Sequence, residues 1–400
     1  MTMSIARMAV GSSAGFKGKL RDAFLLSLPA LFLCLIFDFV GGAVLGKNWN
    51  TIISYFPILV FIMPGLMDLR GNIFSALASR FTTKLHLGLI TDIRDPEVTT
   101  QIVMAILSSK IPLIVLWVVG LFIVHNLFQD VVVLLMVIAS AIFIGVILGY
   151  GTAAITVYPF KRGYDPDLIA APLISSLADL ITMPTMVYFA LLYLSRPVPF
   201  YLLAFSMLAV LVFLALRAKF KHEHRRAFGE LATVIGAMAL VETVTGGLLT
   251  TYGKVINAVI IVSVMWPSVN DSMGNFGSII AAKVSTKIHL EGVEAVKSTE
   301  TLYDFVSLMI LAPIIGYLTN VISMWVVIHY IGRPARIMWQ FVLGFPAVIF
   351  IAMVIGLLMA VLADKYRWDP DNVAIPVVTT LSDVIGTMFL VWVAISVLNG

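Results

Sequence analysis

The chain has 400 residues, of which 60% are hydrophobic and only 12% charged, and its mean hydropathy is +1.02. Soluble domains carry about 25% charged residues, so this composition excludes a soluble protein and indicates a polytopic membrane protein. The single cysteine excludes an internal disulfide and a cysteine-based metal site. The formal net charge of +4 comes from basic residues scattered among loops, which fits membrane topology and not nucleic-acid binding.

The apolar runs are long enough to cross a bilayer, since ~30 Å of hydrocarbon takes about 20 residues of helix. They are continuous rather than alternating, which excludes a transmembrane barrel and predicts an all-α helix bundle. The first run is too long for the apolar part of a signal peptide, so we expect it to stay as a span. About eleven spans are predicted. They lie near residues 23–46, 51–87, 99–126, 131–158, 168–195, 199–218, 228–250, 255–288, 301–329, 337–362 and 371–398.

Lysine and arginine fall mainly on one side of these spans. That side receives the basic cluster at 217–226 and most of the other basic residues. The opposite side receives only Lys47, Arg196, Lys254, Arg333 and Arg336. The positive-inside rule therefore predicts a multi-pass protein of the cell membrane with its N-terminus in the cytoplasm and its C-terminus outside.

Three sequence blocks occur twice, in the same order. The pairs are "PGLMDLRGNIFSALASRFTTKLHL" (64–87) with "PSVNDSMGNFGSIIAAKVSTKIHL" (267–290), "DPDLIAAPLISSLADLI" (165–181) with "DPDNVAIPVVTTLSDVI" (369–385), and, more weakly, "DFVGGAVLG" from Asp38 with "ETVTGGLLT" from Glu242. A repeated order of this kind indicates a duplication. The duplicated piece holds about five spans.

We expect four segments: a short cytoplasmic tail (1–20), a first five-span repeat (21–196), a linking span with a basic linker (197–227) and a second repeat (228–400). The extra span gives both repeats the same orientation. Parallel repeats are related by a pseudo-two-fold axis along the membrane normal, and such an axis encloses a central path. The chain would then act as a fused dimer, monomeric as a pseudo-dimer.

The second span of each repeat carries an aspartate and an asparagine four residues apart, which share one face of a helix. These pairs are Asp68 with Asn72 and Asp271 with Asn275. The neighbouring Gly71 and Gly274 allow a close backbone approach or a local break of the helix. An ordinary polar helix end is the alternative. The polar identities persist between the repeats while apolar neighbours differ, which favours a functional site.

The fifth span of each repeat carries a carboxylate, Asp179 or Asp383, on the same stripe as hydroxyl residues. The hydroxyl residues are Ser175, Ser176, Thr379 and Thr380. A carboxylate within the membrane is costly unless it faces water, a partner or a cation. Hydrogen bonding to hydroxyls in the bundle interior is the alternative. Two carboxylates related by the pseudo-axis would repel each other, and a divalent cation between them removes that penalty.

Asp38 and Glu242 add a third acidic pair, near the middle of the first span of each repeat. Carboxylate, amide and hydroxyl ligands favour hard cations such as Mg²⁺, Ca²⁺ or Mn²⁺. A few carboxylates around a hydrated ion are typical of Mg²⁺. The Asp-Pro-Asp segments at 165–167 and 369–371 fit helix N-caps, with a cation site as the alternative.

At these motifs the chain resembles the membrane domain of the MgtE-type magnesium transporters, and most closely the internally duplicated solute carrier family 41 branch. The matching motifs are the Pro…Gly-Asn…Ser block of the second span and the Pro-x-x-Ser/Thr-Ser/Thr-x-x-Asp block of the fifth, over residues 21–400. The resemblance implies a divalent-cation transporter or channel and not an enzyme. It also implies that the second and fifth spans of both halves line the path, with Asp179 and Asp383 as the central ion pair.

The chain departs from that family in two ways. Bacterial members carry a cytoplasmic magnesium-sensing region before the membrane domain, whereas only residues 1–20 precede the first span here, so we expect no soluble sensor domain. Arg70 aligns with Met273, so the two halves are not equivalent. A secondary transporter of a small organic solute is the alternative function. An intramembrane aspartyl protease would need Tyr-Asp and Gly-x-Gly-Asp signatures. A membrane scaffold that transports nothing would give no reason for acidic residues at paired positions of the two repeats.

Overall fold

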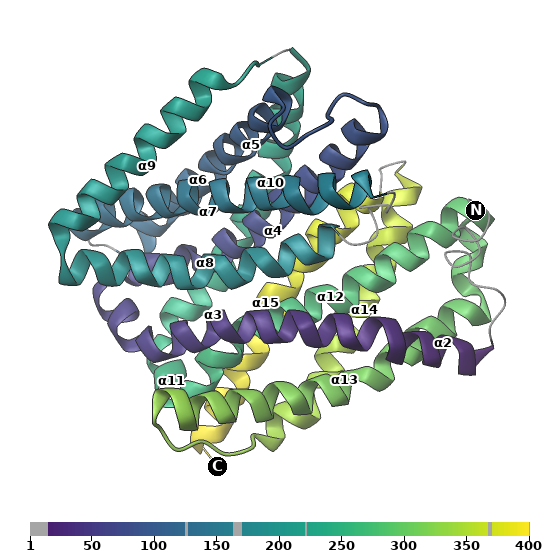
Figure 1. Ribbon diagram of the computed structural model, residues 1–400. Helices are drawn as coiled ribbons and strands as arrows, with labels where there is room; N and C mark the ends of the chain where they lie inside the picture. Colours follow the sequence, from purple (N-terminus) through teal and green to yellow (C-terminus); the bar gives the residue numbers. More distant parts are fainter. Residues whose placement is uncertain (1–14, 125–126, 163–169, 221, 367–369, 400) are drawn as a thin grey trace. The chain divides into compact units, whose positions relative to one another are not determined.

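The computed structural model of the chain describes residues 15–124, 127–162, 170–220, 222–366 and 370–399 (Figure 1). Every regular element in these ranges is a helix, which confirms the predicted all-α bundle. The main helices are α2 (Phe16–Asp22), α3 (Leu28–Tyr55), α4 (Pro57–His86), α5 (Pro96–Ser108), α6 (Lys110–Val124), α7 (Leu127–Lys161), α8 (Ala170–Ser195), α9 (Pro197–Arg217), α10 (His222–Thr251), α11 (Gly253–Ala258), α12 (Ile260–Glu291), α13 (Thr299–Val326), α14 (Trp339–Lys365) and α15 (Pro370–Asn399).

Nine stretches among the described residues are long and apolar enough to cross a membrane, so the protein is a multi-pass membrane protein. The predicted spans at 228–250 and 255–288 are helical but fall outside that set. The first lies in α10, whose apolar part is the shorter Ile235–Thr251. The second covers α11 and α12, and the polar motif of α12 lowers its hydropathy. The first Asp-Pro-Asp segment, 165–167, lies outside the described residues.

One predicted span, 99–126, is interrupted. Helix α5 ends at Ser108 and α6 begins at Lys110, with a turn at Ser109 between them. Pro112 follows at once and has no N–H to donate to the carbonyl of Ser108. The Ser109 hydroxyl donates to the carbonyl of Ile106 at 2.7 Å and so satisfies one backbone acceptor at the interruption.

The chain packs as two compact units. We call them the large unit (Phe37–Pro267, Ser323–Ala335 and Thr387–Gly400) and the small unit (Met1–Ile36, Ser268–Ile322 and Arg336–Gly386). These units cut across the sequence repeats, because α10 of the second repeat lies in the large unit and the residues up to Ile36 of the first repeat lie in the small unit. Helix α10 begins the second repeat but packs on α4, α5 and α6 of the first. In the small unit, α2 packs on α13 of the second repeat through the rings of Phe16 and Tyr303, whose centroids lie 5.7 Å apart.

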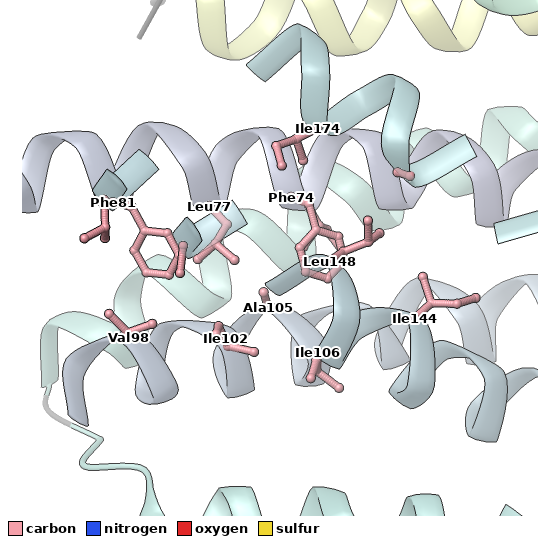
Figure 2. Close-up of a cluster of buried hydrophobic side chains, with 14 of the residues drawn as sticks. Phe74, Leu77, Phe81, Val98, Ile102, Ala105, Ile106, Ile144, Leu148 and Ile174 are labelled. Carbon is pink, nitrogen blue, oxygen red and sulfur yellow. The ribbon is translucent and has the colours of Figure 1, made fainter. Parts of the chain in front are cut away.

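Helix α4 occupies the core of the large unit, in contact with α5, α6, α7, α8 and α10. Figure 2 shows the centre of this packing, where side chains of α4 face those of α5, α7 and α8. The labelled residues are Phe74, Leu77, Phe81, Val98, Ile102, Ala105, Ile106, Ile144, Leu148 and Ile174. The α4 residues recur at helical spacing, so one apolar stripe of α4 is buried. Van der Waals contacts stabilise this packing, because lipid tails are as apolar as the side chains and give no hydrophobic driving force between the helices.

In the small unit, glycines bring α12 close to two other helices. A Cβ at Gly277 would lie 2.8 Å from the Ala352 carbonyl oxygen of α14 and would also contact Val378 of α15. A Cβ at Gly356 would in turn contact the Gly277 carbonyl. Small residues of this kind let membrane helices approach with their backbones in contact. The motif helix α12 is therefore held by close contact with both α14 and α15.

An ion pair recurs where each motif helix meets the next helix. Lys84 of α4 lies 2.6 Å from Glu97 of α5, and Lys287 of α12 lies 3.9 Å from Glu300 of α13 at the same sequence spacing. The two copies then differ. Gln101 donates to Glu97 at 2.9 Å in the large unit. The corresponding residue of the small unit is Asp304.

The Asp304 carboxylate is 4% exposed and lies 2.7–3.5 Å from three lysine Nζ atoms. These lysines are Lys19, Lys283 and Lys287. Because Lys19 belongs to α2, the network joins the leading helix to α12 and α13. Removing one partner from a buried ion-pair network of this kind lowers the stability of the protein, because a buried charge is left uncompensated.

The loop between α4 and α5 is held by two aspartates. Asp95 accepts hydrogen bonds from the backbone N–H groups of Thr91 and Asp92, which lowers the pKa of its carboxyl. Lys161, at the end of α7, lies 2.6 Å from Asp92 and together with the N–H of Arg94 lowers the pKa of that carboxyl. Both groups are exposed, so they fix the loop and contribute little to stability.

Two adjacent glycines of α10 allow a controlled test of the packing in the large unit. A Cβ at Gly246 would run into the backbone carbonyl of Phe61 on α4, whereas a Cβ at Gly247 meets nothing within 4 Å. We expect Gly246→Ala to lower the free energy of unfolding by about 1–3 kcal/mol through overpacking. Gly247→Ala should leave it unchanged or raise it by up to about 1 kcal/mol, because alanine favours helix.

The measurement is thermal unfolding of the purified protein in detergent. Equal unfolding midpoints for Gly246→Ala and Gly247→Ala would contradict the packing of α10 on α4.

Candidate cation site

The two motif helices of the first repeat, α4 and α8, pack against each other in the large unit. A Cβ at Gly71 would lie 3.1 Å from the Ser175 Oγ atom, so the glycine lets α8 come close at the motif. Helix α4 continues through Gly71 without a break. Next to it, the Asn72 amide donates to the Asp68 carboxylate at 3.1 Å. The predicted close approach therefore occurs, and the predicted Asp68–Asn72 face exists as a hydrogen-bonded pair.

The small unit repeats this arrangement with the second copy of the motifs. The Asn275 amide donates to the Asp271 carboxylate at 2.6 Å. A Cβ at Gly274 would lie 3.3 Å from Thr379 Cγ2, so α12 approaches α15 at the residue that corresponds to Ser175. Each unit by itself thus brings a second-span motif and a fifth-span motif together.

Two carboxylates of the large unit lie close together. A carboxylate oxygen of Asp38 on α3 and one of Asp179 on α8 are within 4.8 Å of each other. Asp38 is only 1% exposed. Close packing of the helices brings the two groups together, because a Cβ at Gly41 would lie 3.6 Å from the Asp179 carbonyl oxygen. Like charges at this distance inside an apolar bundle repel each other strongly, and a proton or a cation relieves the repulsion.

Glu242 also joins the large unit, although it belongs to the second repeat. It is 1% exposed, and its Cβ lies 3.1 Å from the place where a Cβ of Gly65 would stand. Gly65 precedes Asp68 by three residues, so Glu242 of α10 packs within about one turn of the α4 motif. Its counterpart Asp38 lies beside Asp179. Both members of the third acidic pair therefore lie in the large unit, Asp38 with its own repeat and Glu242 with the other one.

The hydroxyl groups of the second repeat are engaged within their own helix. Thr379 and Thr380 both donate to the carbonyl of Pro376, at 3.0 and 2.8 Å. Each oxygen keeps lone pairs that can accept a hydrogen bond or contact a cation. Asp383 follows about one turn later on α15 and is partly buried. Ser176, on α8, is 3% exposed.

One residue near the first site was expected only as a difference between the repeats and not as part of a site. Arg70 of α4 is 3% exposed, and its Nη1 donates to the Met186 sulfur of α8 at 3.6 Å. The negative charge of Asp179 acts on this guanidinium. No basic residue lies in the fifth span itself, so a search along that span could not find it. The available signal was the alignment of Arg70 with Met273 in an otherwise matching block.

A second buried cation accompanies Arg70. The Nζ atom of Lys110, at the start of α6, is buried and has no hydrogen-bond partner among the described residues. The charge of Arg70 acts on it as well. The first repeat therefore places both carboxylates and cations in the interior of the large unit.

The comparison with protein families matches the repeated region. The family model described as "MgtE: Divalent cation transporter" matches residues 63–191 and 266–393, which together make up more than half of the chain. Each match begins one residue before a repeated proline, Pro64 or Pro267. The chain belongs to the MgtE family. Its internal duplication places it in the solute carrier family 41 branch, as the similar proteins below confirm.

Curated relatives come from that branch. Solute carrier family 41 member 2 of Mus musculus is 24% identical over 384 residues, and the human protein is 25% identical over 388 residues. Both alignments cover 86% of this chain and 65% of the relative, so the chain spans just under two thirds of their length. Member 3 of Rattus norvegicus is 24% identical over 416 residues, covering 93% of this chain and 88% of the relative. No solved structure matches the chain.

Proposed function

We propose that this MgtE-family protein transports a divalent cation, with Mg²⁺ as its first substrate. The observation that carries the proposal is the carboxylate pair of Asp38 and Asp179, whose oxygens lie within 4.8 Å of each other between two helices of a membrane bundle. Ionised carboxylates at that distance need a compensating positive charge. A transported cation supplies that charge, and the family description supports this function.

The ligand chemistry supports a hard cation. Carboxylate oxygens of Asp38, Asp68 and Asp179 stand with the amide of Asn72 and the hydroxyl of Ser175 in one unit. Oxygen ligands of this kind suit Mg²⁺, Mn²⁺ and Ca²⁺. Mg²⁺ gives up its water reluctantly, so a few carboxylates around a hydrated ion would bind it while still letting it move. Mn²⁺ and Ca²⁺ belong to the same proposal as further substrates.

The path itself is proposed to run on the pseudo-two-fold axis between the repeats. The second and fifth spans of each repeat would line it, and Asp179 and Asp383 would share the central ion. The support is the recurrence of the same packing in both units: Gly71 against Ser175, and Gly274 against Thr379. Asp271, Asn275 and Thr380 would serve on the second side, and Ser176 and Glu242 on the first.

Transport measurements on charge-neutralised variants test this proposal. Asp179→Asn and Asp383→Asn should each weaken the apparent Mg²⁺ affinity by about tenfold, because a carboxylate contact in a partly hydrated site contributes roughly 1–2 kcal/mol. The double variant should retain little uptake, since only neutral dipoles then face the ion. The assay is Mg²⁺ uptake by liposomes that contain the purified protein, with Mn²⁺, Ca²⁺ and ion-free conditions compared.

The double variant should still fold, because neutralising two carboxylates removes repulsion. Its thermal stability without Mg²⁺ should equal or exceed that of the wild type, and its stabilisation by added Mg²⁺ should shrink. Continued uptake by the double variant, with the Mg²⁺-dependent stabilisation intact, would place the ion site elsewhere. Uptake of an organic solute in the absence of any divalent cation would favour the alternative function.

The orientation is proposed from the distribution of basic residues, with the N-terminus in the cytoplasm and the C-terminus outside. A cysteine reporter placed after Gly400 should react with an impermeant reagent added outside intact cells, and one placed before Ser4 should not. The control is the same pair of reporters in permeabilised cells, where both should react. Labelling of both termini from the same side would overturn the odd number of spans and the parallel repeats together.

A further inference from the structure

Arg70 is a buried cation with few partners of its own. A guanidinium carries five N–H donors, and a thioether sulfur such as that of Met186 is a weak acceptor. The Arg70 Nη2 group has no hydrogen-bond partner among the described residues. A guanidinium stays protonated in proteins, so it cannot escape its burial by losing charge. Arg70 therefore depends on a nearby negative charge.

The available negative charges belong to the proposed cation site. Helix α4 packs directly on α8, and a Cβ at Gly71, the residue after Arg70, would lie 3.1 Å from the Oγ atom of Ser175, one turn before Asp179. At this close approach the charge of Asp179 acts on Arg70. Asp38 lies within 4.8 Å of Asp179, so the charge that acts on Arg70 belongs to a carboxylate pair.

The second repeat lacks this cation. Met273 occupies the corresponding place in α12, is fully buried and neutral, and its sulfur lies 3.1 Å from where a Cβ of Gly386 would stand. The surrounding block matches in both repeats: the Asp–Asn hydrogen bond and the close glycine contact recur. The charge at this one position is therefore the main electrostatic difference between the two motif helices near their aspartates.

We propose that Arg70 is a built-in counter-cation of the first half of the path. Its guanidinium balances the Asp38–Asp179 carboxylate pair when no divalent cation is bound, and it opposes a divalent cation that arrives there. The proposal rests on the proposed function, because it assigns unequal attraction for the ion to the two halves that line that path. The half that carries Arg70 attracts the cation less strongly than the half that carries Met273.

The physical reason is competition for the same carboxylates. An arriving ion adds two positive charges beside a fixed positive charge, so part of the attraction by the carboxylates is cancelled. Without the ion, the same guanidinium keeps two close carboxylates from repelling each other inside the bundle. Arg70 thus acts through Asp179 and Asp38 and needs no contact with the ion, which makes it a positioning and affinity-setting residue.

Charge substitutions at Arg70 test this role with the full-length protein in detergent and in liposomes. Arg70→Met copies the residue of the second repeat. It should strengthen the apparent Mg²⁺ affinity by about three- to tenfold, lower the unfolding temperature without Mg²⁺ and enlarge the stabilisation by added Mg²⁺. Arg70→Lys keeps the charge and should stay near the wild type. Met273→Arg should shift the affinity in the opposite direction.

Arg80 provides a matched control on the same helix. It is also a partly buried arginine of α4, its Nε donates to the carbonyl of Ala76 at 3.2 Å, and no carboxylate of the described residues acts on it. Arg80→Met removes a positive charge of the same kind without changing the balance at Asp179. The Mg²⁺ affinity of Arg80→Met should therefore equal that of the wild type.

The outcomes distinguish failure of the counter-cation role of Arg70 from failure of the proposed transport function. If wild-type protein shows neither Mg²⁺ uptake nor Mg²⁺-dependent stabilisation, the proposed function fails. If it shows both, and Arg70→Met has unchanged or weaker Mg²⁺ affinity, the counter-cation role is overturned. If Arg70→Met does not fold, the double variant Arg70→Met/Asp179→Asn should fold, because only one carboxylate of the pair then remains and the repulsion between the two is gone. Failure of that double variant to fold would also overturn the role.

Discussion

The structure depends on the close approach of ionisable side chains inside an apolar helix bundle. Asp38 and Asp179 meet because Gly41 lets α3 lie directly against α8, at the level of the aspartate backbone. Like charges in such a place require compensation. The Arg70 guanidinium supplies part of it from α4, and a transported cation would supply the remainder.

Duplication explains why the arrangement occurs twice and why the copies differ. Both units contain the Asp–Asn hydrogen bond, the glycine contact with the fifth span, and the Lys–Glu pair that follows the motif helix. Because both copies lie in one chain, each position can change independently. Position 70 carries arginine where position 273 carries methionine, and position 101 carries glutamine where position 304 carries aspartate. The shared packing is kept in both units.

The sequence predicted the helices and the two motif faces, because apolar length and i, i+4 spacing are local properties. It did not predict which helices become neighbours. The packing of α10 on α4, which places Glu242 beside Gly65, depends on contacts between distant segments, and so does the packing of α2 on α13. The interruption at Ser109 and the position of Arg70 near Asp179 were missed for the same reason. Spacing identifies the face of a helix but not the side chain opposite it.

The most direct test of the central claim is the position of a bound ion in a crystal of this protein grown with Mn²⁺, located by anomalous diffraction. Mn²⁺ prefers the same oxygen ligands as Mg²⁺ and is visible by its anomalous signal. The account predicts a peak beside the carboxylate of Asp179 or Asp383 that disappears in the double variant Asp179→Asn/Asp383→Asn. Peaks confined to exposed carboxylates such as Asp92 and Asp95, with none at Asp179 or Asp383, would contradict it.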